Sequence, residues 1–136
     1  MTTTPTTRRL VVTVPGPDPA LSPNARVHWA KLRKVKAAAR EESWAVCLDM
    51  LGRDKEEAGW WWEMEPVGRR VTIKRTFIRP TKRVADIDNL EASTKSMADG
   101  LADALGVNDR IFHWLPSEVI VERGRRAVVF EIEVQG

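Results

Sequence analysis

The chain has 136 residues, of which 43% are hydrophobic and 30% charged, with a formal net charge of +3, as is typical of one globular domain rather than of a disordered or fibrous protein. Its single cysteine, Cys47, excludes an intrachain disulfide, and the lack of a cysteine and histidine cluster excludes a structural zinc site. No apolar run approaches the ~20 residues that cross a bilayer, and the first residues lack the apolar core of a secretory signal, so we expect a cytosolic protein with no membrane partner.

The pattern of apolar residues predicts an α/β (α+β) fold, with two main helices on a small mixed sheet. We expect a disordered N-terminal tail at residues 1–8 and a single domain at residues 9–136. The predicted elements are a strand at Leu10–Val14, a helix at about Trp29–Leu51, a strand at Val67–Ile78, a helix at Asn89–Leu105, and a C-terminal hairpin of Ser117–Val121 with Ala127–Val134. The predicted order is therefore β–α–β–α–β–β.

Three consecutive tryptophans, Trp60 to Trp62, lie between the first predicted helix and the second predicted strand. In a strand they would point to both faces, which favours a buried strand or a contact between two copies of the chain. Stacking on nucleic-acid bases is the alternative function for such a cluster.

Basic and acidic residues are segregated along the chain, although their totals nearly cancel. Six basic residues and no acid lie between Arg26 and Arg40, and seven basic residues and no acid between Arg69 and Arg83. An acidic segment from Asp86 to Asp109 follows, with six acids and one lysine. Solvated surface faces would explain any one block, but two acid-free basic blocks in so short a chain favour a polyanionic partner, of which nucleic acid is the commonest.

Two carboxylates stand two residues apart in the run Asp86-Ile-Asp88-Asn89-Leu90, directly after the second basic block. In an extended segment this spacing directs both side chains to one side, where two ionised groups repel unless a cation lies between them. A hard ion such as Mg²⁺, which takes carboxylate, water and phosphate oxygens, is the natural partner. Asp88 alone also fits the N-cap of the helix that follows. A third acid, Asp109, comes after that helix and would have to return to the pair by tertiary folding.

These residues resemble a known family. The run DIDNL, a following helix with Lys95, Asp99 and Leu101 in the pattern Lys-x-x-x-Asp-x-Leu, and an acid just past that helix are similar to the RusA family of Holliday junction resolvases. The N-terminal strand, the turn into Asn24 and the basic helix also fit the family's order. The resemblance covers about residues 9–134, and its specific part is about residues 86–109.

The resemblance implies a small homodimeric endonuclease that depends on Mg²⁺, with Mn²⁺ able to substitute. Such an enzyme would resolve four-way DNA junctions in recombination and repair by paired symmetric nicks, in the cytoplasm of a bacterial or phage-infected cell. By motif match, the catalytic and metal-binding aspartates are Asp86, Asp88 and Asp109, and the catalytic lysine is Lys95.

The lysine departs from the family pattern. The family has it four residues after the second aspartate, where this chain has Ala92. Offsets of four and seven residues share one face of a continuous helix, so Lys95 is the candidate. Lys82 or Arg83 is the alternative source of positive charge.

The predicted reaction is hydrolysis of a phosphodiester. The aspartates would hold a metal that polarises the scissile phosphate and lowers the pKa of the attacking water, while Lys95 stabilises charge in the transition state. Basic residues are predicted to hold DNA arms through their phosphates: Arg33, Lys36, Arg40, Arg69, Arg75, Arg79, Lys82 and Arg83. Two alternatives stay open, a nuclease acting on flaps, forks or RNA, and a nucleic-acid-binding module without catalysis.

Overall fold

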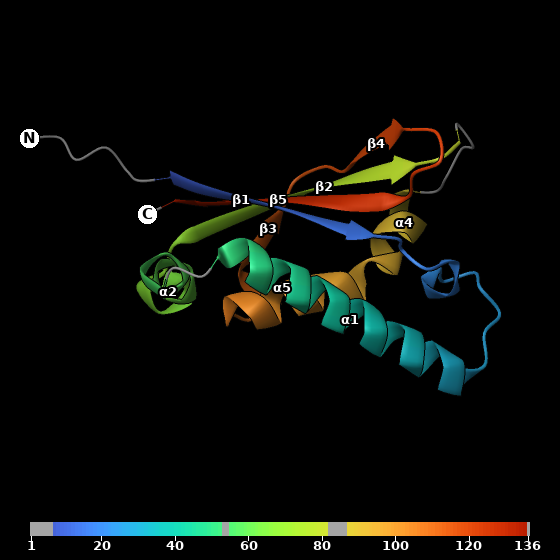
Figure 1. Ribbon diagram of the computed structural model, residues 1–136, viewed down its shortest axis with the longest axis horizontal. Helices are drawn as coiled ribbons and strands as arrows, with labels where there is room; N and C mark the ends of the chain where they lie inside the picture. Colours follow the sequence, from blue (N-terminus) through green and yellow to red (C-terminus); the bar gives the residue numbers. More distant parts are fainter. Residues whose placement is uncertain (1–6, 53–54, 82–86, 136) are drawn as a thin grey trace, which may run out of the picture.

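A five-stranded mixed sheet forms one layer of the molecule, and helices cover one of its faces (Figure 1). The computed structural model describes residues 7–52, 55–81 and 87–135. The strands are β1 (Thr7–Pro15), β2 (Arg70–Arg79), β3 (Phe112–Trp114), β4 (Glu118–Val121) and β5 (Ala127–Gln135). The helices are α1 (Trp29–Leu51), α2 (Lys55–Trp62), α3 (Met64–Val67), α4 (Ile87–Ser93) and α5 (Lys95–Leu105), with short 3₁₀ turns η1 (Pro19–Leu21) and η2 (Asp109–Ile111). The predicted α/β class is confirmed.

The strand that closes the chain lies in the middle of the sheet. β5 pairs antiparallel with β1 on one side and with β2 on the other, while β3 and β4 pair parallel with the far edge of β2. The predicted hairpin of β4 with β5 is therefore wrong, because β2 lies between them. Burial gives the physical reason: every second residue of β5, from Val128 to Val134, is fully buried, whereas all four residues of β4 are exposed. The more apolar strand takes the central position.

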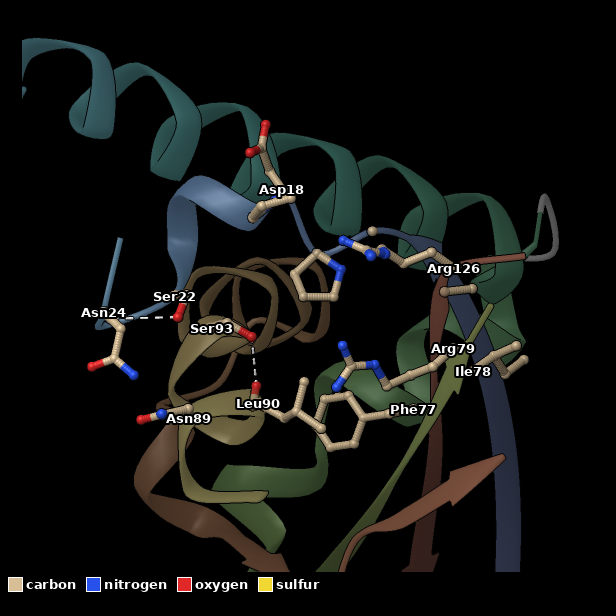
Figure 2. Close-up of a pocket in the computed structure, with 14 residues that line it drawn as sticks. Asp18, Ser22, Asn24, Phe77, Ile78, Arg79, Asn89, Leu90, Ser93 and Arg126 are labelled. Atoms are coloured by element: carbon tan, nitrogen blue, oxygen red, sulfur yellow. Dashed lines mark hydrogen bonds between the residues drawn. The ribbon is translucent and has the colours of Figure 1, made fainter. Parts of the chain in front are cut away.

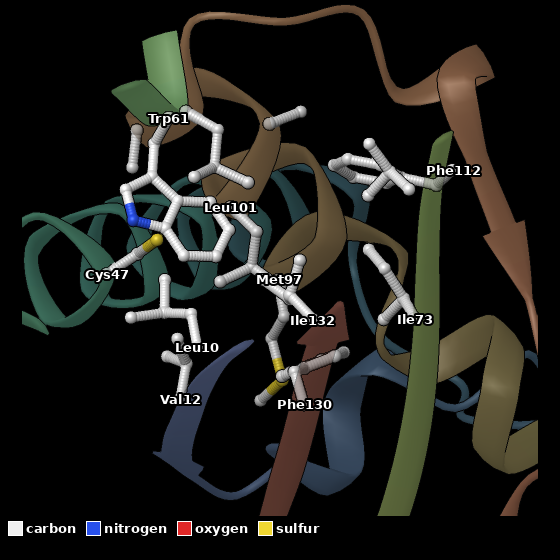
Figure 3. Packing of buried hydrophobic residues seen from close by; sticks show 14 of the residues in the cluster. Leu10, Val12, Cys47, Trp61, Ile73, Met97, Leu101, Phe112, Phe130 and Ile132 are labelled. Carbon is white, nitrogen blue, oxygen red and sulfur yellow. The ribbon is translucent and has the colours of Figure 1, made fainter. Parts of the chain in front are cut away.

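The hydrophobic core fills the space between the sheet and helices α1 and α5 (Figure 3). β1 and β5 contribute alternate side chains, as a sheet with one covered face requires. Cys47 of α1 lies in this core, and burial raises the pKa of its thiol to about 12. Such a thiol stays protonated and unreactive at neutral pH. No helix in the described ranges is long and apolar enough to cross a membrane.

The tryptophan cluster belongs to a helix, so the predicted strand at Trp60–Trp62 is wrong. α2 spreads the three rings at about 100° per residue. Trp61 is buried beside Cys47, and the indole Nε1 of Trp62 donates to the carbonyl oxygen of Ala104 at 3.0 Å. Two of the three rings are thus used for packing within the chain.

Trp60 binds two arginines of the same chain. The guanidinium of Arg8 lies 4.3 Å from the centre of the Trp60 ring, and that of Arg69 lies 4.2 Å from it. Arg8 belongs to β1, which begins at Thr7, so the last two residues of the predicted disordered tail are in the sheet. These cation–π contacts leave Trp60 little ring surface for a nucleic-acid base.

The single helix predicted at Asn89–Leu105 is two helices, α4 and α5, separated at Thr94. Thr94 has φ −101° and ψ 6°, and its hydroxyl donates to the carbonyl oxygen of Glu91 at 2.8 Å. Lys95 and Ala92 therefore do not lie on one continuous helix. The helix geometry that made Lys95 the candidate for the catalytic lysine does not apply.

Helices α1 and α5 approach each other at Gly100. A Cβ built there would overlap the carbonyl oxygen of Arg40 and the hydroxyl of Ser43. The Ser43 hydroxyl donates to the carbonyl oxygen of Met97, one turn earlier in α5. Only glycine permits this backbone contact, which sets the spacing of the two main helices.

Gly100→Ala is expected to lower the free energy of unfolding by about 3 kcal/mol or more, because the clash involves backbone that cannot rotate away. Gly59→Ala is the matched control, since Gly59 also lies within a helix but a Cβ there meets nothing within 4 Å. The control should be neutral or stabilising by up to about 1 kcal/mol. Urea unfolding of both variants measures the difference, and equal stabilities would contradict the close approach.

Candidate functional site

Helix α4, which carries Asp88, is fixed to the sheet by one buried guanidinium. Arg75 of β2 donates from Nη2 to Glu91 Oε2 at 2.8 Å and from Nη1 to Thr94 Oγ1 at 3.3 Å. Its guanidinium also lies 4.0 Å from the centre of the Trp114 ring. The Arg75 side chain is only 10% exposed, and burial lowers its pKa while the Glu91 carboxylate opposes that change. Arg75 therefore stabilises the fold, and the prediction that it contacts DNA is wrong.

The structure places Asp88 and Asp109 toward opposite ends of β2. Asp88 lies exposed in the first turn of α4, just beyond the C-terminal end of that strand. Asp109 precedes Phe112, which is in register with Val71 at the strand's beginning. The ten residues of β2 span ~30 Å, so one chain does not bring these two carboxylates together.

The other member of the predicted pair, Asp86, lies outside the described residues, as do Lys82 and Arg83. Within the described part of the chain, no group of three histidine, cysteine, aspartate or glutamate side chains is arranged to hold a metal ion. Lys95 is exposed at the start of α5 and lines a hollow of about 390 Å³ together with Lys36 of α1 and Asp99. The hollow thus brings together one lysine from each of the two predicted helices, Lys36 and Lys95.

Two more of the predicted DNA-binding residues are engaged within the protein. Arg40 forms two hydrogen bonds with the Asp103 carboxylate, at 2.6 and 2.8 Å, and this contact holds the pKa of Asp103 below its usual range. Arg69 lies on the Trp60 ring and donates to the Trp60 carbonyl oxygen at 2.8 Å. Of the described candidates, Lys36 and Arg79 therefore keep an ammonium or guanidinium outside such contacts, while the guanidinium of Arg33 lies 5.8 Å from the centre of the Trp29 ring.

A cavity of about 390 Å³ lies beside the start of α4 (Figure 2). Four separate segments line it: the turn after β1 with η1, the end of β2, helix α4 and the start of β5. Its polar side chains include the guanidiniums of Arg79 and Arg126 and the amides of Asn24 and Asn89. Figure 2 shows the two guanidiniums to the right of α4 and the side chains of Asn24 and Asn89 to the left, with the Asn89 amide directed away from the guanidiniums. Its apolar residues are the half-buried Leu90 and the buried Phe77 and Ile78.

One of the two arginines of this cavity has an unsatisfied buried donor, and the other is exposed at its rim. Arg79 Nη1 is buried and has no hydrogen-bond partner in the described residues, and neither Arg79 nor Arg126 forms an ion pair with any acid among them. The buried Nε atoms of Arg69 and Arg75 also lack hydrogen-bond partners, but those guanidiniums lie on tryptophan rings. A buried donor without an acceptor costs about 1–3 kcal/mol, so Arg79 is poised for an acceptor that enters the cavity.

Sequence reasoning missed Arg126 and the role of Asn24 because four separate segments meet at the cavity only in the folded chain. The local signal for Arg126 was the pair of arginines just before the last strand, which was interpreted as part of a hairpin turn.

Comparison with known proteins adds similarity but no function. No protein-family model matches this chain. An uncharacterized protein of Xylella fastidiosa (strain Temecula1 / ATCC 700964) is 41% identical over 101 residues, which cover 74% of this chain and 61% of that protein. The chain thus spans less than two thirds of this relative. The crystal structure of thiamine-monophosphate kinase from Stenotrophomonas maltophilia K279a matches 97% of this chain and 31% of its own, at 11% identity and a TM-score of 0.41, which is too low to bear on fold or function.

Arg75→Gln is expected to lower the free energy of unfolding by about 1–3 kcal/mol, because it removes the charged partner of Glu91 and the stack on Trp114. Arg70→Gln, an exposed arginine of the same strand, is the control and should change stability by less than about 0.5 kcal/mol. Urea unfolding gives both values. An Arg75→Gln protein as stable as the wild type, but weaker in DNA binding, would return Arg75 to the DNA surface.

Proposed function

We propose that this chain is a Mg²⁺-dependent, structure-specific endodeoxyribonuclease that acts on four-way DNA junctions. The observation that carries the proposal is the position of the run Asp86-Ile-Asp88-Asn89-Leu90. Its described part begins α4, and Asn89 and Leu90 of the same run line a cavity that holds two arginines without acidic partners in the described residues. The Asp88 carboxylate thus directly precedes residues that share a cavity with two guanidiniums, and a carboxylate for a metal beside guanidiniums for a phosphate is the combination that phosphodiester hydrolysis needs.

The residues present suit a hard divalent cation. Asp88 is exposed at the start of α4, where a hydrated ion has access, and carboxylate oxygens are the protein ligands that Mg²⁺ prefers. Asp86 and Asp88 would hold the ion, and its chemistry would be to polarise the phosphate and to lower the pKa of a bound water. Arg79 and Arg126 would bind phosphate oxygens beside the reacting group, and the ammonium of Lys95 would approach the strand from the start of α5.

Asp109 joins this site only through a second copy of the chain, because within one chain it stays near the other end of β2. The proposed homodimer supplies that copy, and its two-fold symmetry suits a junction whose opposed strands are both cut. Exposed apolar side chains for the contact follow the edge of the sheet: Trp114, Leu115, Val119, Ile120 and Val121. Of the three tryptophans that the sequence offers for such a contact, Trp61 is buried in the core.

DNA binding would be directed to the backbone. Arg33 and Lys36 are exposed on α1, the longest helix of the described chain, and Lys36 lies beside Lys95. Contacts of this kind neutralise phosphates without distinguishing bases. The shape of the substrate, rather than its sequence, would therefore determine where the protein binds.

Asp86→Asn, Asp88→Asn and Asp109→Asn are each expected to reduce junction cleavage about 10²-fold or more, since loss of a ligand carboxylate weakens the electrostatic clamp on the phosphate. Junction binding should persist or tighten, because each change removes a negative charge that repels DNA. Gel assays of cleavage and of binding measure the two effects separately. Asp49→Asn, an exposed acid near the end of α1, is the control and should cleave at the wild-type rate.

Mixing the Asp88→Asn and Asp109→Asn proteins in equal amounts tests the role of the second copy. Partial recovery of cleavage is expected if each copy supplies one of the two carboxylates. Cleavage by all three single variants at the wild-type rate would contradict the metal site and favour a nucleic-acid-binding module without catalysis. A monomeric mass by light scattering at micromolar protein would contradict the homodimer.

A further inference from the structure

The cavity beside α4 has the electrostatics of an anion site. Two arginines line the same cavity without a neutralising acid in the described residues, and an anion between like charges would remove their repulsion. Asp18 is the one carboxylate among the lining residues, but its Oδ1 accepts from the backbone N–H of Ala20 at 2.9 Å. Figure 2 shows that carboxylate directed away from Arg79. A phosphate would supply the acceptor that the buried Arg79 Nη1 lacks.

The rest of the cavity suits more than a phosphate. Its volume of about 390 Å³ falls in the range of small-molecule sites, and a phosphate alone would leave most of it to water. Leu90, which is half-buried, offers an apolar surface for a flat ring, and the buried Phe77 lies behind it. The amides of the lining residues Asn24 and Asn89 each carry a donor and an acceptor, as the edge of a nucleobase does.

The hydroxyls of the cavity are already engaged in holding its wall. Ser93 Oγ donates to the Leu90 carbonyl oxygen at 2.6 Å, and Ser22 Oγ accepts from the Asn24 backbone N–H at 3.4 Å (Figure 2). Neither bond uses the side-chain amide of Asn24 or Asn89. The two amides therefore stay available to a ligand, while the backbone around them is fixed.

We propose that this cavity binds one nucleotide unit, with its phosphate between Arg79 and Arg126 and its base against Leu90, on the side of the cavity that Asn24 and Asn89 line. The proposal rests on the proposed function in taking the nucleotide as an unpaired residue of the strand to be cut. It goes beyond that function because backbone contacts alone read no base. A base held in this cavity would give the enzyme a nucleotide preference next to the cut and a requirement for local unpairing.

Calorimetric titration in EDTA tests the site apart from cleavage. The probes are inorganic phosphate, each of the four deoxynucleoside monophosphates, and a six-nucleotide single-stranded DNA. Arg126→Gln and Arg79→Gln should each weaken nucleotide binding about tenfold, as expected for loss of a charge-assisted hydrogen bond. Arg123→Gln makes the same change of charge three residues from Arg126, outside the cavity, and should bind within about twofold of the wild type.

Arg79→Lys covers the case in which the glutamine at this part-buried position disturbs folding, because it keeps the charge and loses the planar fork. It should bind nucleotides more weakly than the wild type at an unchanged melting temperature. Equal affinities of Arg126→Gln and Arg123→Gln would overturn the proposal. So would equal affinities of the wild type for inorganic phosphate and for the nucleotides, since the base would then contribute nothing.

The two ligand sources are separated by the same titrations. Tighter binding of the oligonucleotide than of any monophosphate supports a residue of a strand, and the reverse supports a free nucleotide in the same cavity. Failure of the proposed function gives a different result: no cleavage of any DNA in Mg²⁺ by a protein whose nucleotide binding still depends on Arg126. Failure of the cavity proposal alone gives junction cleavage by a wild-type protein that binds no nucleotide.

Discussion

The buried guanidinium of Arg75 fixes the position of helix α4 and therefore of the candidate site. Arg75 projects from β2 toward the helical layer, and its contacts reach α4 through Glu91, the start of α5 through Thr94, and β3 through Trp114. An arginine in this position must keep its partners, because a buried guanidinium without them is strongly destabilising. The partners include the residue that separates α4 from α5, so the same contact ends one helix and begins the other. Asp88 and Asn89 follow as the opening turn of a helix that cannot slide along the sheet.

Internal pairing also divides the basic residues into two groups. Arg8 and Arg69 bind Trp60, Arg40 binds Asp103, and Arg75 binds Glu91, so these cations stabilise the fold. Among the predicted DNA-binding residues that the structure describes, the cations outside such contacts lie at two places, the exposed face of α1 with Lys36 and the cavity beside α4 with Arg79. The two places differ in kind, because α1 offers an open charged surface while the cavity places a part-buried guanidinium beside apolar residues. In the proposed enzyme, the first would position DNA and the second would hold the nucleotide near the cut.

The local sequence pattern correctly predicted those helices and strands that depend mainly on residues close together in the chain. The expected helix at about Trp29–Leu51 coincides with α1, and the expected strand at Leu10–Val14 lies within β1. Features that depend on distant segments could not be predicted from local pattern. One is the position of β5 between β1 and β2. Another is the break between α4 and α5 at Thr94, whose hydroxyl accepts from the buried Arg75 of β2. The helical form of the tryptophan run was missed for the same reason. A strand would direct consecutive rings to opposite faces, whereas α2 spreads them around its axis and buries Trp61. At the site, the motif around Asp88 and Asn89 was visible in the sequence, but its neighbours Arg126 and Asn24 came from segments that only the fold brings together.

Cleavage of defined DNA substrates by the wild-type protein tests the proposed function most directly. A four-way junction, a fork and a linear duplex with the same arm sequences would each be end-labelled and incubated with Mg²⁺ or with EDTA. The proposed function predicts paired nicks in opposed strands of the junction, in Mg²⁺ only, and an intact linear duplex. Cleavage of the fork in preference to the junction would identify a nuclease for other branched DNA. Intact substrates throughout, despite measurable binding, or cleavage that continues in EDTA, would contradict a metal-dependent junction endonuclease.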